Sequence, residues 1–298
     1  MKTQYFGLHM RASDARKTVR LSDGVSLSMI DTGVGEPIVI VPEQLIGRFA
    51  RTNRVIAIDM RGHGESDVPD FGYRISRFAA DLQEILQQLE VSHATLFGHS
   101  MGCSVIWCYL EIFGFNRVSS LILADQGVTL VADPSWNTGE CLEAGAVFTS
   151  EQMHGLLGTL RSADGETASR AVLGSMVSER FPAAEMERLV ADNLILPREY
   201  AASLLRDHAF KDWRYLVARI TVPTLCIGGK DSVVPWQAMA EIGRMIEHSR
   251  TVVLADNSFS SHFAFLESPQ AFAEAIEDFL DANALTSDSS MATGTSDR

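Results

Sequence analysis

The stretch LFGHSMG, residues 96–102, places Ser100 between two glycines in the pattern G-x-S-x-G. An apolar run, 94–97, leads into it, and a helix-like run, 103–110, follows it. Between a strand and a helix this pattern predicts a sharp turn that exposes the serine hydroxyl at the carboxyl end of the strand. The flanking glycines remove Cβ atoms that would clash in such a turn. We therefore expect Ser100 to be a nucleophile and the Met101 N–H, at the start of the helix, to face an oxyanion.

Strand-like apolar runs alternate with amphipathic helix-like runs along most of the chain. The expected strands are 18–21, 25–30, 37–41, 54–59, 94–97, 118–124, 222–229 and 251–255, and the expected helices are 43–51, 75–89, 103–110, 237–246 and 269–280. Such alternation is typical of an α/β fold in which helices cover a mainly parallel sheet. At 298 residues the chain suits one large α/β domain with an insertion, or two small domains.

The pattern changes in the middle of the chain, where strand-like runs vanish and four segments look helical (near 151–161, 166–177, 183–193 and 198–208). We interpret this part as a helical cap inserted into the core. The expected division is a weakly ordered 1–16, a first core part 17–128, the cap 129–211, a second core part 212–283 and a disordered tail 284–298.

A serine nucleophile needs a base, and His262 follows the last expected strand. A histidine base needs an acid that holds its tautomer. Asp231 ends the preceding strand after a glycine-rich lead, and Asp125 ends an earlier strand and is the alternative acid. The order Ser100, Asp231, His262 is the serine–acid–histidine order that accompanies this kind of turn. All these residues follow strand carboxyl ends, where open α/β sheets place their ligand sites.

The chain is similar to proteins of the α/β-hydrolase-fold superfamily, of the serine esterase and haloperoxidase-like AB hydrolase-1 type. The resemblance runs from about residue 18 to residue 280 and rests on DMRGHGES (59–66), GHSMG (98–102), GGKD (228–231) and SHF (261–263). It implies an α/β-hydrolase fold with a helical cap, in which Ser100 is the nucleophile, His262 the general base and acid, and Asp231 its orienting acid. Epoxide hydrolases and haloalkane dehalogenases of this fold use an aspartate nucleophile, so Ser100 argues against both.

The segment after the expected strand 37–41 departs from the family pattern. Relatives carry a His-Gly or Pro-Gly stretch there, and its loop supplies a second oxyanion N–H. Here only twelve residues, 42–53, connect two parallel strands, which is about what a crossover with its helix requires. Pro42 has no N–H to donate. We expect this shortened oxyanion loop to impair turnover, because loss of one oxyanion donor commonly costs about 10²–10³-fold.

The favoured function is hydrolysis of a small to medium, largely apolar carboxylic ester through an acyl-enzyme. Two alternatives stay open. One is perhydrolase or haloperoxidase-type chemistry, in which the same triad passes the acyl group to peroxide instead of water. The other is a non-catalytic small-molecule-binding protein, which would keep the pocket while tolerating a missing oxyanion donor.

The composition argues against several classes of binding partner. The net charge of −13 argues against binding nucleic acid or an anionic membrane surface, and no apolar run approaches the ~20 residues of a membrane span. The N-terminus lacks an apolar signal region, so we expect a cytoplasmic protein. None of the four cysteines, at 103, 108, 141 and 226, has metal-ligand spacing. We expect no metal and no cofactor, and a small-molecule substrate as partner; the oligomeric state is left open.

Overall fold

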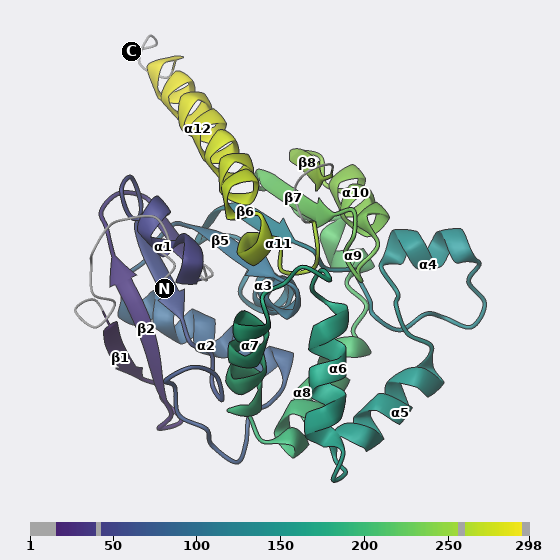
Figure 1. Cartoon of the computed structure of the whole chain (residues 1–298). Helices are drawn as coiled ribbons and strands as arrows, with labels where there is room; N and C mark the ends of the chain where they lie inside the picture. The colour runs from purple at the N-terminus through teal and green to yellow at the C-terminus, as the bar shows by residue number, and fades with distance from the viewer. Residues whose placement is uncertain (1–15, 40–42, 256–259, 294–298) are drawn as a thin grey trace.

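The computed structural model describes residues 16–39, 43–255 and 260–293 (Figure 1). Within these residues eight strands form one sheet in the order β1-β2-β4-β3-β5-β6-β7-β8. The strands are β1 Arg16–Arg20, β2 Ser26–Thr32, β3 Pro37–Val39, β4 Arg54–Ile58, β5 Ala94–His99, β6 Val118–Ala124, β7 Thr224–Gly229 and β8 Ser249–Leu254. β2 runs antiparallel to both β1 and β4, and the strands from β4 to β8 pair in parallel. The predicted α/β architecture with a mainly parallel sheet is therefore confirmed.

Helices cover both faces of the sheet. The core helices are α1 Glu43–Phe49, α2 Ile75–Gln88, α3 Met101–Phe113, α10 Trp236–Met245, α11 Ala264–Glu267 and α12 Pro269–Thr293. In β5, Leu96 joins the hydrophobic core beneath α2, α3 and α10, whereas Phe97 joins the core beneath α1, α11 and α12. Successive side chains of a strand point to opposite faces, so a strand buried on both faces carries an unbroken apolar run. This is why such runs predict the parallel strands.

A helical insertion connects β6 to β7. It contains α4 Thr138–Ala144, α5 Ser150–Leu160, α6 Gly165–Ser175, α7 Ala183–Leu194, α8 Arg198–Ala209 and α9 Arg214–Val217. Capping boxes begin two of these helices, with Asn137 and Glu140 at α4 and Thr149 and Gln152 at α5. A third hydrophobic core joins α5 to α8. In Figure 1 the helices α4 to α8 gather below and to the right of the sheet.

The expected boundaries near the two ends of the chain can be compared with the structure. Residues 1–15 and 294–298 lie outside the described part, and Arg16 already begins β1. The expectation of a disordered tail from residue 284 is corrected, because α12 continues to Thr293 and projects from the body of the molecule (Figure 1). Residues 40 and 41, expected to end a strand, also lie outside the described part.

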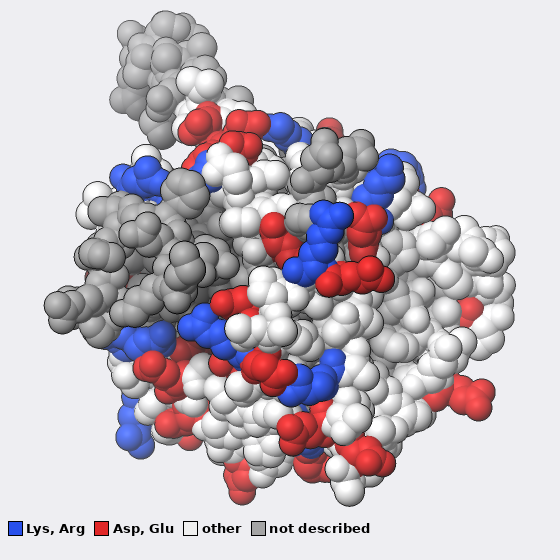
Figure 2. All heavy atoms as spheres, in the orientation of Figure 1, with Lys and Arg blue, Asp and Glu red and all other residues white. Residues whose placement is uncertain are grey.

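The distribution of charged side chains and the apolarity of the helices can be compared with the sequence analysis. Figure 2 shows Lys and Arg intermixed with Asp and Glu over the visible face, without a field of one sign. In the part of the chain described above, no helix combines the length and apolarity that crossing a bilayer requires. The cytoplasmic location stays a prediction.

The turn between β5 and α3 is tight, and Ser100 adopts φ 51° and ψ −126° there. A Cβ atom on Gly98 would lie 2.7 Å from the Cys103 nitrogen and 2.8 Å from the Gly102 carbonyl carbon. A Cβ atom on Gly102 would meet nothing within 4 Å. The expectation that both flanking glycines relieve a clash is therefore right for Gly98 and wrong for Gly102. Only at Gly98 does the strand pass so close to the helix that follows.

We predict that Gly98→Ala lowers the free energy of unfolding by about 1–3 kcal/mol, the usual cost of overpacking. The matched control is Gly102→Ala, which should stay within about 1 kcal/mol of the wild type because its Cβ atom has open space. Urea unfolding followed by circular dichroism measures both. Equal destabilisation by the two substitutions would contradict this account of the turn.

Candidate active site

The carboxyl ends of β5, β6 and β7 lie side by side, because these strands are consecutive neighbours in the sheet. Ser100 follows β5, and its backbone N–H donates to the Ala124 carbonyl at the end of β6 over 2.9 Å. Asp125 follows β6, and its backbone N–H donates to the Ile227 carbonyl of β7 over 2.8 Å. Two backbone hydrogen bonds thus fix the serine turn and the first residue after β6 to one edge of the sheet.

The side chain that meets Asp125 at this edge is His262. His262 Nδ1 lies 2.7 Å from Asp125 Oδ2, and the two residues are 4% and 5% exposed. Since a carboxylate oxygen accepts, Nδ1 carries the proton in this contact. A neutral imidazole has one N–H, so Nε2 is then the unprotonated nitrogen and acts as a proton acceptor. This is the tautomer that a histidine base requires.

Two further contacts hold the Asp125 carboxyl group in place. Oδ1 accepts the Gly229 N–H over 3.2 Å, and Oδ2 also accepts the Ser232 hydroxyl. The backbone of Asp125 has φ 53°, a left-handed conformation that aspartate tolerates better than most residues. Three donors, from Gly229, Ser232 and His262, therefore converge on one buried carboxylate, and the first two fix its orientation toward His262.

Asp231, which we expected to orient His262, lies elsewhere. Its Oδ2 accepts the Ser260 hydroxyl over 2.7 Å, and its N–H donates to the same hydroxyl oxygen over 3.3 Å. The expected pairing of Asp231 with His262 is thus wrong, and the alternative acid, Asp125, takes that contact. The two acids differ in their contacts: the Asp125 carboxylate reaches Nδ1 of His262, whereas the Asp231 carboxylate accepts the Ser260 hydroxyl.

The motif histidine His99 supports the backbone of His262. Its Nε2 donates to the His262 carbonyl over 2.7 Å, and its ring lies 4.7 Å from the His262 ring and 4.9 Å from that of Phe265. Burial, with a smaller contribution from the charge of His262, lowers the pKa of His99 to about 3. His99 is therefore uncharged near neutral pH, and it holds the His262 loop as a neutral donor.

The stretch 59–66 builds a turn after β4. Arg61 is fully buried and bonds to Asp81 through Nε over 2.7 Å and to Asp23 through a terminal nitrogen over 2.7 Å. His63 Nδ1 lies 3.0 Å from the Arg61 carbonyl and so donates to it, and burial lowers the pKa of His63. The stretch is one of the motifs on which the family resemblance rests, and the contacts of Arg61 and His63 described here are structural.

Cys103 is the first buried residue of α3. Its thiol donates to the Gly98 carbonyl over 3.2 Å, and burial raises its pKa far above the usual range. A buried thiol held as S–H is not a nucleophile. Cys103 therefore packs the turn, as its place on the helix predicts.

The structure describes one of the two expected oxyanion donors and not the other. Met101 is the first residue of α3, so its N–H belongs to the first helical turn, which has no acceptor within the helix. The shortened loop at Pro42 lies outside the described residues. Met101 thus keeps the position that the sequence predicts, and the second donor stays a prediction.

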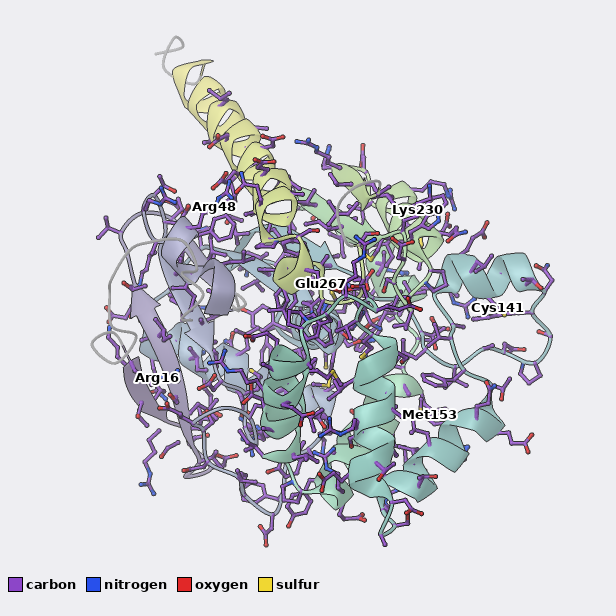
Figure 3. The ribbon with its side chains drawn as sticks, viewed as in Figure 1. Arg16, Arg48, Cys141, Met153, Lys230 and Glu267 are labelled. Carbon is purple, nitrogen blue, oxygen red and sulfur yellow. The ribbon has the colours of Figure 1, made fainter. Side chains whose placement is uncertain are left out.

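Glu267, at the end of α11, is a residue that sequence reasoning missed. Its carboxylate accepts the Ser178 N–H over 3.2 Å, the Ser178 hydroxyl and the Ser261 hydroxyl. Ser178 belongs to the insertion, whereas Ser261 directly precedes His262. Figure 3 shows Glu267 between α11 and the ends of α6 and α7. The carboxylate thus ties the insertion to the loop that carries His262, over 89 positions of sequence.

The lowered pKa of His99 makes stability depend on pH. Unfolded His99 takes up a proton near pH 6.5 and the folded residue near pH 3, so the unfolded state binds more protons between these values. The free energy of unfolding should therefore fall as pH falls through this window, by up to about 1.4 kcal/mol per pH unit for one group. His99→Gln removes this contribution, so the variant should lose stability less steeply.

Urea unfolding at a series of pH values from about 7 down to about 4.5 measures the slope for each protein. The control is His248→Gln, at an exposed position, which should keep the wild-type slope. An unchanged slope in His99→Gln would show that His99 is protonated as readily in the folded as in the unfolded chain.

Known proteins resemble this chain over most of its length. A family model described as alpha/beta hydrolase fold matches residues 41–269. The AB hydrolase superfamily protein YisY of Bacillus subtilis is 26% identical over 277 residues, covering 88% of this chain and 97% of YisY. The 3-oxoadipate enol-lactonase 2 of Acinetobacter baylyi is 30% identical over 236 residues, covering 79% of this chain and 81% of that protein. The solved esterase EaEST from Exiguobacterium antarcticum has a TM-score of 0.79 at 24% identity, covering 89% of this chain and 99% of its own.

Proposed function

Because this chain belongs to the alpha/beta hydrolase fold family, we propose that it is a serine hydrolase acting on a small to medium, largely apolar carboxylic ester, open-chain or cyclic. The observation that carries the proposal is the buried 2.7 Å contact between His262 Nδ1 and Asp125 Oδ2, at the strand end beside Ser100. The names of the esterase and enol-lactonase relatives support an ester or lactone bond as the target.

In the proposed reaction, Ser100 Oγ attacks the substrate carbonyl carbon while His262 Nε2 takes the hydroxyl proton. The Met101 N–H stabilises the negative charge that forms on the carbonyl oxygen. His262 then returns the proton to the leaving alkoxide oxygen, which departs as an alcohol, and an acyl-Ser100 ester remains. Water attacks this ester by the same route, with His262 again as base, and releases the carboxylic acid and free Ser100.

Asp125 has two tasks in this scheme. It keeps the proton of neutral His262 on Nδ1, and it stabilises the imidazolium that forms during each proton transfer. The donors from Gly229 and Ser232 serve both tasks, because they prevent the carboxylate from rotating away from the ring.

The helical insertion is the proposed cover of the substrate. It leaves the core directly after Asp125, at the carboxyl end of β6, so its first segment starts at the edge of the sheet that carries Ser100. The Ser178–Glu267–Ser261 contacts join its far part to the His262 loop. A cover held in this way would exclude water and strengthen the electrostatic contacts around the reacting carbonyl.

We predict that Ser100→Ala abolishes hydrolysis of p-nitrophenyl acetate and butyrate. Asp125→Asn should lower kcat by about 10³–10⁴-fold, because an amide favours the wrong tautomer of His262. The matched control is Asp231→Asn, which should stay within about threefold of the wild type, since an amide oxygen still accepts the Ser260 hydroxyl. Steady-state kinetics of the three variants measures this. A larger loss in Asp231→Asn than in Asp125→Asn would overturn the proposed acid.

Labelling by a fluorophosphonate separates the enzyme from a binding protein of the same fold. The wild type should be labelled at Ser100 and the Ser100→Ala variant should not, with intact-protein mass spectrometry as the readout. A folded wild type that is neither labelled nor active would contradict the hydrolase proposal.

A further inference from the structure

The two carboxylate oxygens of Glu267 hold two different segments of the chain. Oε1 accepts the Ser178 hydroxyl, and Oε2 accepts the Ser261 hydroxyl. The Ser178 N–H also donates to both oxygens, over 3.3 Å to Oε1 and 3.2 Å to Oε2. Both oxygens belong to one planar group, and each can accept. A displacement of Ser178 that turns this group therefore also displaces the oxygen that holds Ser261.

The Ser261 contact closes a short loop of chain around the proposed base. Ser261 directly precedes His262 and is six positions from Glu267. The Glu267 N–H donates to the carbonyl of Phe263, the residue that caps the start of α11, over 3.3 Å. Glu267 thus bonds to the residue before His262 through its side chain and to the residue after it through its backbone. The position of the imidazole therefore depends on the position of Glu267.

The two serines that contact Glu267 differ in burial. Ser261 is 4% exposed, whereas Ser178 and Glu267 are both partly exposed. A buried hydroxyl that loses its partner stays unsatisfied, but a partly exposed one bonds to water instead. Opening the Ser261 contact is therefore costly, and the Ser178 contact is the one suited to open and close.

Other contacts attach the insertion to the core at α8. The Asp207 carboxylate accepts the Ile75 N–H at the start of α2 over 2.8 Å. The ring of Tyr200 stacks on that of Tyr73, with the centroids 4.8 Å apart. These contacts do not involve the segment between α6 and α7, which carries Ser178. Release of Ser178 therefore does not require α8 to leave the core.

We propose that Glu267 is a positioning residue that couples the insertion to the base. When Ser178 binds the carboxylate, the insertion is closed and His262 is aligned, and both are lost together when Ser178 leaves. The inference rests on the proposed function and deepens it, because it states how that site is regulated. A substrate that fits beneath the closed insertion favours the closed state. Binding energy from parts of the substrate remote from the ester would then align the base and raise kcat.

The test compares Ser178→Ala with Ser261→Ala in the hydrolysis of p-nitrophenyl butyrate. Both variants should lower kcat by about tenfold, the loss that corresponds to one hydrogen bond to a carboxylate, and keep KM within about twofold. An insertion that merely covers the substrate predicts a raised KM at unchanged kcat for Ser178→Ala. Ser178→Thr and Ser261→Thr, which keep the hydroxyl, should retain most of the activity. The matched control is Ser175→Ala, which should keep the wild-type constants because its hydroxyl bonds within α6 to the Val172 carbonyl.

A double-mutant cycle distinguishes coupling from two independent contacts. The double variant Ser178→Ala/Ser261→Ala should also lose about tenfold, because either change already breaks the link through Glu267. In a Glu267→Ala background, each serine substitution should change kcat by less than about twofold. A loss of about hundredfold in the double variant would show that the two contacts act independently, and it would overturn the inference.

Titration with the fluorophosphonate counts the reactive serines in each preparation. Expressing kcat per reactive serine separates a misaligned base from a poorly folded variant. An effect of Ser178→Ala on KM alone would overturn the inference while leaving the proposed hydrolase intact. A wild type that neither hydrolyses the ester nor reacts with the fluorophosphonate would instead overturn the proposed function, and the inference with it.

Discussion

The contact between His262 and Asp125 is the interaction on which the rest of the site depends. It joins the loop after β8 to the end of β6, and so crosses the strand between them, β7. Each partner is supported from its own side, Asp125 by Gly229 and Ser232 and His262 through the hydrogen bond from His99 to its carbonyl. A 2.7 Å contact between two buried groups survives only when the surrounding structure satisfies the remaining polar atoms. The supporting donors meet that condition.

Much of this arrangement follows from the sequence, and the choice of acid shows where prediction stops. The strands are predictable because their apolar runs face a core on both sides, and the serine turn is predictable because its glycine pattern lies between a strand-like and a helix-like run. Asp125 and Asp231 resemble each other locally, since each is an aspartate that follows a buried strand. What distinguishes them is the path of the loop after β8, which brings the His262 ring to Asp125 and the Ser260 hydroxyl to Asp231. The path of that loop depends on its tertiary contacts, so no local pattern decides between the two residues.

Other contacts cannot be predicted from local sequence patterns, for a related reason. Ser178 and Glu267 are 89 positions apart, and each is an ordinary polar residue in its own segment. Their contact exists because the insertion packs back onto the loop before α11. The continuation of α12 to Thr293 illustrates a different limit. A Ser-, Thr- and Asp-rich stretch favours irregular structure by propensity, but extending a helix that is already nucleated costs far less than starting one.

The charges around the proposed base form a consistent system. The pKa of His99 lies well below neutrality, and burial is the larger cause, with the charge of His262 adding to it. In the proposed reaction this ring therefore does not compete for the proton that His262 receives, and it adds no positive charge beside the imidazolium. The carboxylate of Asp125 is the group that favours this imidazolium, and the sheet edge presents it to Nδ1. In the proposed reaction, its carboxylate partner distinguishes the His262 ring from that of His99, which donates to a backbone carbonyl.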